Sequence, residues 1–377
     1  MENLDWLPNA LDFAVKKIRE NLPTFEEKVI PAASKNLVYQ PEDNTDWTAS
    51  FWIGMLFLAK EVTESDDFDA VIKKQMASFT HRLENRIGLE THDIGFLYSL
   101  SAVFDYQENG NESSKELAIQ AADLLMERYS EKAGIIQAWG NLNDPNESGR
   151  MIVDCLMNLP LLYFAARETG DDRYKKAAYT HAKQTQKYIV RDNYTTFHTY
   201  YFDVNTGVAI EGKTQQGYAD DSCWARGQAW GIYGFTLSYL HTGDYSFLET
   251  AKHVADYFIS QLPEDKVCYW DLVFNDGSGQ ERDSSSAAIA ACGLLELSKQ
   301  LPLSDEKHDH YEKVALEMLE ALAQNYTTKD HPESNGILTE GVYDKNSDKG
   351  VNECMSWGDY YYVEALTRLT KSWYSVW

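Results

Sequence analysis

A chain of 377 residues could hold two or three average domains or one large helical barrel, so its length alone does not fix the number of domains. The formal net charge of −25 leaves no basic surface to release counterions from phosphates, which argues against nucleic acid and anionic membranes as partners. No apolar run approaches the roughly 18–20 residues of a transmembrane helix. The composition therefore predicts a soluble protein.

The N-terminal segment MENLDWLPNALDFAVKKIREN mixes charged and spaced apolar residues, unlike a secretion signal. The five cysteines are widely scattered and have neither a CxxC pair nor the spacing of metal ligands, which is typical of reduced thiols inside a cell. Motifs of the HExxH, P-loop, dinucleotide-binding and GxSxG types are absent. We therefore predict a cytoplasmic protein without a metal or other cofactor.

Helical periodicity recurs in pairs along the chain, with one amphipathic helix followed by one that is apolar nearly all round. The amphipathic helices are expected at 6–21, 66–86, 114–130, 172–190, 245–262 and 306–326. Their apolar partners are expected at 48–62, 93–106, 151–168, 225–241, 284–300 and 358–371.

The turns support this pairing, because ETGDDRY and HTGDYSF each place a glycine to end one helix and an aspartate to cap the next. Strand-like alternation is confined to short pieces such as YTTFHTYYFD and VCYWDLVF. Six hairpins with one apolar helix each close most simply into a double ring. We predict an all-α fold, an (α/α)6 barrel forming a single domain over residues 1–377, present as a monomer or weak homodimer.

The loops that enter the apolar helices converge on one end of such a barrel, and they carry the chemically reactive residues. Each places Asp, Trp, His, Arg or Gly just before or within the first turn of an inner helix. These loops are DNTDWTASFW, THDIGFLYSL, QAWGNLNDPNESGRMIVDC, TQQGYADDSCWARGQAW, GSGQERDSSSA and NECMSWGDYYY. The sequence predicts that they line one pocket.

Asp154 lies in the apolar run MIVDCLMNLPLLYFA, where an ionised carboxylate is costly unless it is paired, hydrogen-bonded or protonated. It could cap a helix, but it follows three apolar residues and would then lie inside the first turn. Asp93 in THDIG poses the same choice between capping and function. If both point inward, they form a carboxylate pair suited to general acid–base chemistry on a sugar.

Other loop residues have structural as well as functional interpretations. His92 and His198 are the best placed of the nine histidines, although loop histidines are often surface hydrogen bonders. Arg226, within an apolar helix, needs an anion, which is either an internal acid or a substrate carboxylate. The chain has 10 tryptophans and 24 tyrosines, and stacking on sugar competes with core packing for four of the tryptophans, Trp47, Trp139, Trp224 and Trp230.

The pocket loops and the helices that follow them resemble the unsaturated glucuronyl hydrolases of glycoside hydrolase family 88. The resemblance covers nearly the whole chain, through DNTDWT with FWIG, HDIGFLYSLSA, GIIQAWG, GRMIVDCLMNLPLL, FHTYYFD, WARGQAWGIYGF, RDSSSAAIAACGLLEL and SWGDYYYVEAL. That family has the same barrel and acts after polysaccharide lyases, which leave a 4,5-unsaturated uronic acid at the non-reducing end of an oligosaccharide. The implied partner is therefore an unsaturated oligosaccharide substrate.

The resemblance implies hydration of the C4=C5 enol ether, after which the hemiketal collapses and releases the sugar and a keto acid. By motif, Asp154 is the acid and base, and Asp93 is the second essential carboxylate. We expect Asp154 to be protonated before substrate arrives, because its apolar surroundings and Asp93 both penalise the ionised form. The motifs also imply substrate contacts from Trp47, Trp139, Trp224, Trp230, His92, His198, Gln216 and Arg226.

Two positions bear on substrate preference. Family members that favour sulfated disaccharides resemble one another in having an arginine before the QG of the fourth loop, where this chain has Gln215. They also have a Ser/Lys cluster before the last motif, of which Ser347 and Lys349 remain, with Asp344 where another serine is expected. We expect Ser347 and Lys349 to contact substrate, and unsulfated or lightly sulfated disaccharides from chondroitin or hyaluronan to be preferred.

Three alternatives stay open at this point. An unsaturated rhamnogalacturonyl hydrolase would share the barrel and the hydration but act on pectin-derived disaccharides. A sugar 2-epimerase, also an α/α barrel, would depend on a histidine pair. A non-catalytic carbohydrate-binding scaffold would bind saccharides through its tryptophans without using the buried acids.

Overall fold

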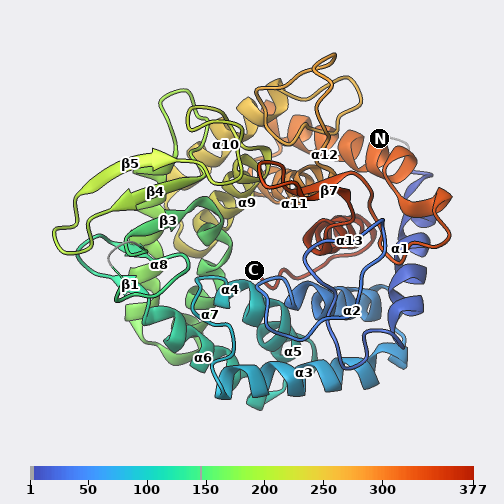
Figure 1. The fold of residues 1–377 in the computed structure, drawn as a ribbon, viewed down its shortest axis with the longest axis horizontal. Helices are drawn as coiled ribbons and strands as arrows, with labels where there is room; N and C mark the ends of the chain where they lie inside the picture. The colour runs from blue at the N-terminus through green and yellow to red at the C-terminus, as the bar shows by residue number, and fades with distance from the viewer. Residues whose placement is uncertain (1–3, 145–146) are drawn as a thin grey trace.

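The computed structural model describes residues 4–144 and 147–377, so Pro145 and Asn146 of the third loop lie outside the described residues. Six helices form an outer ring: α1 (Leu7–Asn21), α3 (Asp69–Glu84), α6 (Glu112–Met126), α8 (Asp172–Gln184), α10 (Tyr245–Ser260) and α12 (Glu306–Asn325). The inner ring comprises α2 (Ser50–Thr63), α4 (Ile94–Tyr98) continued by α5 (Phe104–Asn109), α7 (Leu159–Thr169), α9 (Ala225–Thr242), α11 (Ser284–Gln300) and α13 (Ser356–Thr370). Viewed along the barrel axis, the two rings are concentric (Figure 1). The predicted six-hairpin barrel is confirmed.

The two GD turns begin and end helices as predicted. Gly170 and Gly243 adopt left-handed backbone conformations, with φ of 72° and 71°, directly after α7 and α9. The following Asp171 accepts a hydrogen bond from the backbone N–H of Arg173, and Asp244 accepts one from Ser246. Each turn therefore reverses the chain between an inner helix and the next outer helix.

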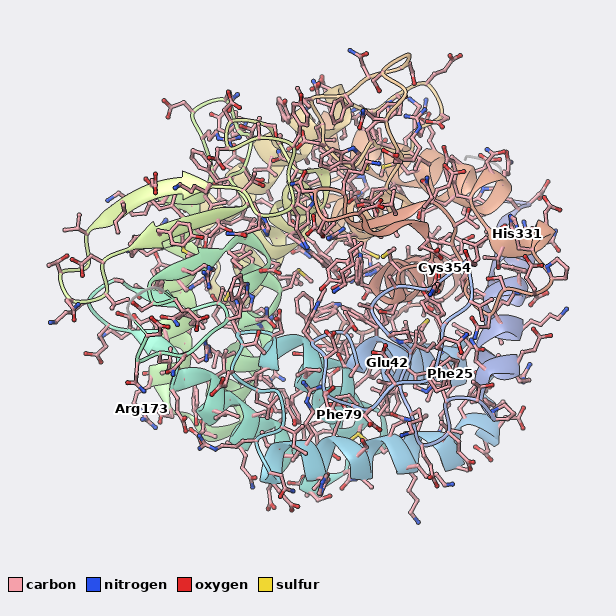
Figure 2. All side chains as sticks on the ribbon, in the orientation of Figure 1. Phe25, Glu42, Phe79, Arg173, His331 and Cys354 are labelled. Atoms are coloured by element: carbon pink, nitrogen blue, oxygen red, sulfur yellow. The ribbon has the colours of Figure 1, made fainter. Side chains whose placement is uncertain are left out.

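The inner helices carry the core. Residues 225–238 of α9 and 284–298 of α11 are buried without exception, which explains why their sequences are mostly apolar or small, with Arg226, Gln228 and Glu296 as exceptions. The outer helices bury only one face, as in α6, whose buried residues recur at helical spacing. Side chains fill most of the space between the two rings, with Arg173 at the outer edge and Cys354 inside (Figure 2).

Segments from both ends of the chain close the ring. Helix α1 packs against α13, and Ala33 forms an antiparallel bridge with Met355. The Ser34 backbone N–H donates to the Cys354 carbonyl at 2.9 Å. Among the described residues, no helix combines the length and apolar character required to cross a membrane.

The short strands differ from the prediction. A three-stranded antiparallel sheet joins β3 (Arg150–Ile152), β4 (Thr199–Phe202) and β5 (Ala209–Lys213), so YTTFHTYYFD does contain a strand. VCYWDLVF does not; its only pairings are isolated bridges such as Trp224 with Asp271. Two hairpins, β1 (Tyr129–Ser130) with β2 (Ile135–Ile136) and β6 (Gly341–Asp344) with β7 (Lys349–Glu353), were not predicted.

Two inner helices also depart from their predicted form. The predicted helix at 151–168 begins as strand β3, continues through a 3-10 turn at Val153–Met157, and becomes α7 only at Leu159. Pro160 lies in the first turn of α7, where its missing N–H is tolerated, and it would break a helix that started earlier. The helix predicted at 93–106 passes through a π-helical turn at Ser99–Val103 and extends to Asn109.

Candidate active site

The loops before the inner helices enclose a pocket of about 300 Å³ at one end of the barrel. Ten of the twelve residues predicted to act in the site line it together. Among the residues that the structure describes, the lining is Trp47, His92, Asp93, Trp139, Ile152, Asp154, His198, Gln215, Gln216, Trp224, Arg226, Trp230, Tyr343 and Asp344.

A close contact between two inner helices brings the two aspartates together. A Cβ on Gly95 would overlap the backbone of Asn158, so only glycine allows this approach. The Asn158 side chain then accepts a hydrogen bond from the Phe96 backbone N–H at 2.7 Å. Asp93 lies two residues before this contact and Asp154 four residues before it, and both face the pocket.

His92 lies between the two carboxylates. Its Nε2 is 3.4 Å from Asp93 Oδ1 and 3.3 Å from Asp154 Oδ1, and its side chain is 1% exposed. The His92 backbone is fixed because its N–H donates to the Ala138 carbonyl at 2.7 Å. In the part of the chain that the structure describes, neither carboxylate oxygen that faces His92 has a partner with hydrogen-bond geometry, and both aspartates line the pocket.

The capping interpretation fails for both aspartates. Asp93 occupies the N-cap position of α4, but its side chain does not bond to the helix N–H groups. Instead, the Thr91 hydroxyl donates to Asp93 Oδ2 at 2.5 Å. Asp154 lies in the 3-10 turn between β3 and α7, where Val153, Cys155, Leu156 and Met157 are buried, and its side chain is 18% exposed toward the pocket. Neither carboxylate therefore serves a helix terminus.

Charge in this cluster is distributed differently from the prediction. Burial raises the pKa of Asp93 to about 6, although the His92 charge opposes the shift. Burial also acts to raise the pKa of Asp154, but the charge of the adjacent His92 outweighs burial, so this pKa lies below its ordinary value. The expectation that Asp154 is protonated in the empty site is therefore wrong. Sequence could not reveal that His92 would lie against it.

Burial opposes protonation of His92, but the charges of Asp93 and Asp154 outweigh it and hold the pKa of His92 well above its ordinary value. The empty site accordingly holds an imidazolium beside an ionised Asp154. Each of His92, Asp93 and Asp154 offers one ligand atom within 4.8 Å of the others, so the group has the donors to bind a divalent cation. Such a cation would have to displace the imidazolium proton.

His198 presents a neutral N–H to the pocket. Its Nδ1 accepts hydrogen bonds from the backbone N–H groups of Gln215 at 2.9 Å and Gln216 at 3.2 Å, which places the ring proton on Nε2. Burial lowers the pKa of His198 to about 4, so the ring stays uncharged near neutral pH. Its ring packs at 4.3 Å on Trp224.

Arg226 combines the two roles that the sequence left open. Its guanidinium lies 3.4 Å from Asp283 and donates to the Val342 and Tyr343 carbonyls, so it is held internally. It also donates to Gln216 Oε1 at 3.1 Å. The Gln216 amide must then direct its NH₂ group elsewhere, and Gln216 lines the pocket. Arg226 therefore supplies positive charge and orients a neutral donor.

The four predicted tryptophans form the walls. Trp47 stacks on Trp357 at 5.4 Å and donates its indole N–H to the Tyr343 hydroxyl at 3.2 Å. Trp139, at the rim, is 39% exposed and is covered on one face by the Arg150 guanidinium at 3.5 Å. Trp224 and Trp230 are almost fully buried and show the pocket only part of their rings.

A family model described as Glycosyl Hydrolase Family 88 matches residues 24–373. The chain belongs to glycoside hydrolase family 88. It is 45% identical to the unsaturated chondroitin disaccharide hydrolase of Streptococcus pneumoniae over 98% of this chain and 93% of that protein.

Solved structures of family 88 relatives have the same fold. The unsaturated glucuronyl hydrolase of Streptococcus agalactiae superposes with a TM-score of 0.97 at 44% identity, covering 100% of this chain and 95% of that chain. An aspartate-to-asparagine mutant of that enzyme, complexed with dGlcA-GalNAc6S, superposes with a TM-score of 0.88 at 42% identity over 98% of this chain and 93% of that one. The predicted family is confirmed.

Two predicted substrate contacts of this family 88 chain lie outside the pocket lining. Ser347 lies in the turn of the β6–β7 hairpin, where its hydroxyl donates to Asp344 at 2.7 Å. Lys349 places its Nζ over the ring of Tyr343 at 4.2 Å. Each residue therefore contacts a side chain that lines the pocket, without lining the pocket itself.

Ile152 and Tyr343 also line the family 88 site, and neither was predicted to do so. Gln215 and Asp344, which line it too, were predicted only to bear on substrate preference. Tyr343 and Asp344 belong to β6, which was not predicted. The signal was present, because GVYD and KGVNE flank the turn-forming KNSD. Ile152 follows from β3, whose pairing with the distant β4 no local pattern reveals.

Proposed function

We propose that this family 88 hydrolase hydrates the C4=C5 double bond of a 4,5-unsaturated glucuronic acid at the non-reducing end of glycosaminoglycan-derived disaccharides. The observation that carries the proposal is a buried imidazole shared by two carboxylates at the base of a pocket walled by tryptophans. The activities named for the relatives, unsaturated chondroitin disaccharide hydrolase and unsaturated glucuronyl hydrolase, support the same substrate class. The products would be the released sugar and an open-chain keto acid.

In the proposed reaction, Asp154 donates a proton to C4 as the π electrons form the new C4–H bond. Water then adds its oxygen at C5 while Asp154 takes a proton from that water, which restores the carboxylic acid. The product is a hemiketal at C5, which collapses to a ketone and releases the second sugar. Asp93 orients His92 and, through it, Asp154. The His198 Nε2–H and the Gln216 amide bind polar groups of the substrate.

Substrate binding would cause Asp154, which is ionised in the empty pocket, to become protonated. The substrate carries its own carboxylate, which adds negative charge and displaces water, and both effects raise the pKa of a neighbouring acid. The proton is close by, because His92 Nε2 lies 3.3 Å from Asp154 Oδ1 and Asp93 has a pKa of about 6. Asp154 would thus take up a proton and become a neutral carboxylic acid when the anionic substrate enters.

The first experiment follows the ultraviolet absorbance of the conjugated enol-ether carboxylate while the protein is mixed with an unsaturated chondroitin disaccharide. Decay of the band with release of free amino sugar and keto acid supports hydration. Faster decay of a pectin-derived unsaturated disaccharide would instead favour the rhamnogalacturonyl activity. Binding without any decay would indicate a scaffold. An epimerase would survive Asp154→Asn but not His198→Ala.

The pocket margin supports a preference for unsulfated or lightly sulfated disaccharides. Asp344 and Gln215 line the pocket, and an acidic side chain there repels a sulfate. Asp344→Asn should raise the ratio of kcat/KM on a 6-sulfated disaccharide to that on the unsulfated one, with Asp348→Asn in the hairpin turn as the matched control. An unchanged ratio would remove Asp344 from substrate selection.

We also propose a cytoplasmic location and a monomer or weak homodimer. All five cysteines are buried and unpaired, which suits a reducing compartment. Sedimentation at two protein concentrations would separate a monomer from a weak dimer, and cell fractionation would test the location.

A further inference from the structure

Beneath the pocket, an irregular segment after α13 returns to the axis of the barrel. The ribbon runs from Thr370 to Trp377 at the centre of the inner ring, where Figure 1 marks the C-terminus. Trp377 is 5% exposed, and its indole N–H donates to Glu364 Oε2 at 2.8 Å. In the same segment, Tyr374 is 87% exposed, so burial is selective for particular side chains.

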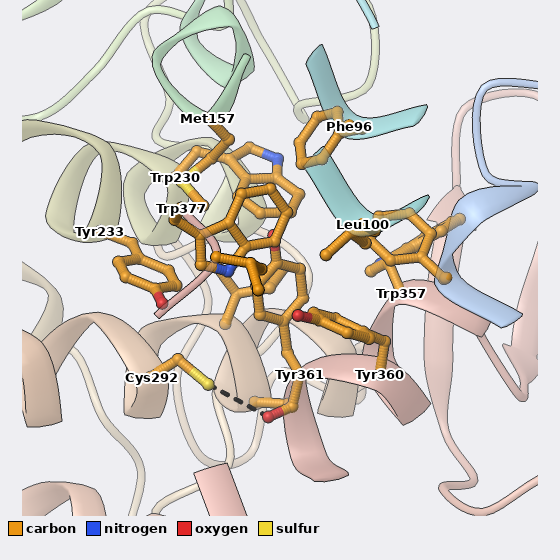
Figure 3. Close-up of a cluster of buried hydrophobic side chains, with 14 of the residues drawn as sticks. Phe96, Leu100, Met157, Trp230, Tyr233, Cys292, Trp357, Tyr360, Tyr361 and Trp377 are labelled. Atoms are coloured by element: carbon orange, nitrogen blue, oxygen red, sulfur yellow. Dashed lines mark hydrogen bonds between the residues drawn. The ribbon is translucent and has the colours of Figure 1, made fainter. Parts of the chain in front are cut away.

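Trp377 packs on a layer of rings that also supports the active site (Figure 3). It stacks on Tyr361 with centroids 6.0 Å apart and meets Phe96 edge-on at 5.9 Å. Phe96 in turn contacts Trp47 at 5.7 Å and Trp230 at 5.5 Å, both of which line the pocket. One fully buried ring, Phe96, therefore separates Trp377 from two walls of the substrate site.

A second contact route has the same form. Tyr361, on which Trp377 stacks, meets Trp230 edge-on at 5.4 Å. On the side away from the pocket, Trp377 borders a cavity of about 700 Å³ that is also lined by Trp373, His241 and Arg167. Because open space already lies below Trp377, removing its ring would join that space to the underside of Phe96 and Tyr361.

We propose that Trp377 is a positioning residue that holds the orientation of Trp47 and Trp230 by supporting Phe96 and Tyr361 from below. It touches neither substrate nor the catalytic aspartates. This inference rests on the proposed function in so far as Trp47 and Trp230 bind the sugar. Rings that bind ground state and transition state equally affect KM rather than kcat, so loosening them should raise KM selectively.

The test compares Trp377→Ala, Trp377→Leu and Trp377→Phe, with Tyr374→Ala as the control from the same segment. Below the unfolding temperature, we expect Trp377→Ala and Trp377→Leu to raise KM about two- to tenfold with kcat within about twofold. Trp377→Phe keeps a ring against Phe96 but loses the bond to Glu364, and it should restore KM. Tyr374→Ala should leave both constants unchanged. The leucine variant keeps the test open if the alanine variant does not fold.

Binding of the unsaturated chondroitin disaccharide is measured in parallel by calorimetry, with each Trp377 change placed in an Asp154→Asn background. The Kd should rise by the same factor as KM and fall back in the phenylalanine variant. Lower thermal stability with unchanged KM and Kd would overturn the proposal, because Trp377 would then be merely structural. A Kd difference in a protein that turns over no unsaturated disaccharide would count against the proposed function alone.

Discussion

Buried charge gathers at both ends of the inner ring, and the two clusters differ in how completely they are satisfied. At the far end, the Arg368 guanidinium donates to Glu364, Glu296 and the Tyr233 hydroxyl. Every carboxylate oxygen there accepts a hydrogen bond, including Glu364 Oε2 from Trp377 and Glu296 Oε1 from Gln300. This cluster has no donor or acceptor left for a ligand.

At the pocket end, Asp93 Oδ1, Asp154 Oδ1 and His92 Nδ1 are buried without a hydrogen-bond partner. An unsatisfied buried polar group costs free energy, and a ligand that completes its bonding offsets that cost. The comparison teaches that burial of an acid does not mark function, since Glu364 is more buried than Asp93 or Asp154. What distinguishes the pocket end is that its unpaired acids line a cavity.

The largest effect should come from Asp154→Asn, which removes the proposed acid and base. We expect kcat to fall about 10⁴-fold, because general acid–base groups contribute 10²–10⁴-fold and this residue acts twice. The free energy of unfolding should change by less than about 1 kcal/mol. Asp309→Asn, whose side chain is 90% exposed, is the control. A variant that retains most of its kcat would exclude Asp154 from the chemistry.

Arg368→Met should break the far cluster instead. It leaves Glu364 and Glu296 buried without their cation, so the free energy of unfolding should fall by about 3–5 kcal/mol. The kcat of the folded fraction should be retained, because no group near substrate is changed. Urea denaturation gives the stability, and Arg173→Met on the exposed surface should cost less than about 0.5 kcal/mol. Equal effects of both variants would contradict the comparison.

Asp93→Asn should lower the turnover and raise the free energy of unfolding. In the native state the pKa of Asp93 is about 6, against about 3.9 in an unfolded chain. The native state thus binds this proton more tightly, and ionising Asp93 costs up to about 3 kcal/mol of stability as the pH rises from 4 to 6. The variant avoids that cost, so its stability advantage over the wild type should grow between about pH 4 and 6 and then level off.

Urea denaturation across this range measures the Asp93→Asn difference, while the ultraviolet assay should show lost turnover. Asp359→Asn is an instructive counterpart, because Asp359 is also buried, with a pKa raised to about 7. Its oxygens, however, accept bonds from Tyr39, Ile337 and Leu338, and an amide cannot accept all of them. That variant should lose stability at every pH; a gain would contradict the argument.

The smallest expected effect concerns metals. His92, Asp93 and Asp154 offer three ligand atoms, but the proposed chemistry uses them for protons. Turnover should therefore be unchanged by EDTA, and added Zn²⁺ should inhibit by competing with the proton on His92. Loss of activity in EDTA with recovery on adding a divalent cation would overturn the metal-free prediction.

The helical pairing was predictable because it depends on residues close together in the sequence, through apolar periodicity and the turns around Gly170 and Gly243. The strands were not, since Met151 pairs with Tyr200 across a large sequence separation. The pocket residues were found because Asp93 and Asp154 sit in apolar surroundings and because the motifs resemble a known family.

The charge state of the site was beyond the sequence. It depends on the contact between Gly95 and Asn158 and on the orientation of the His92 ring, neither of which has a local signature. The apolar run around Asp154 suggested a raised pKa, but the His92 imidazolium at 3.3 Å, together with the charge of Arg226, reverses the direction of the shift. Composition near a residue indicates desolvation, whereas the geometry of its partners decides the outcome.

The closure of the ring by Ala33 and Met355 has a consequence for folding. The pocket takes residues from Trp47 through Asp344, so only a fragment that spans at least residues 47–344 contains every described lining residue. Contacts between such distant residues form slowly, because much of the chain must be ordered first. Recovery of enzymatic turnover during refolding therefore reports the last step, the joining of the first and sixth hairpins, and it should lag behind the recovery of helical circular dichroism.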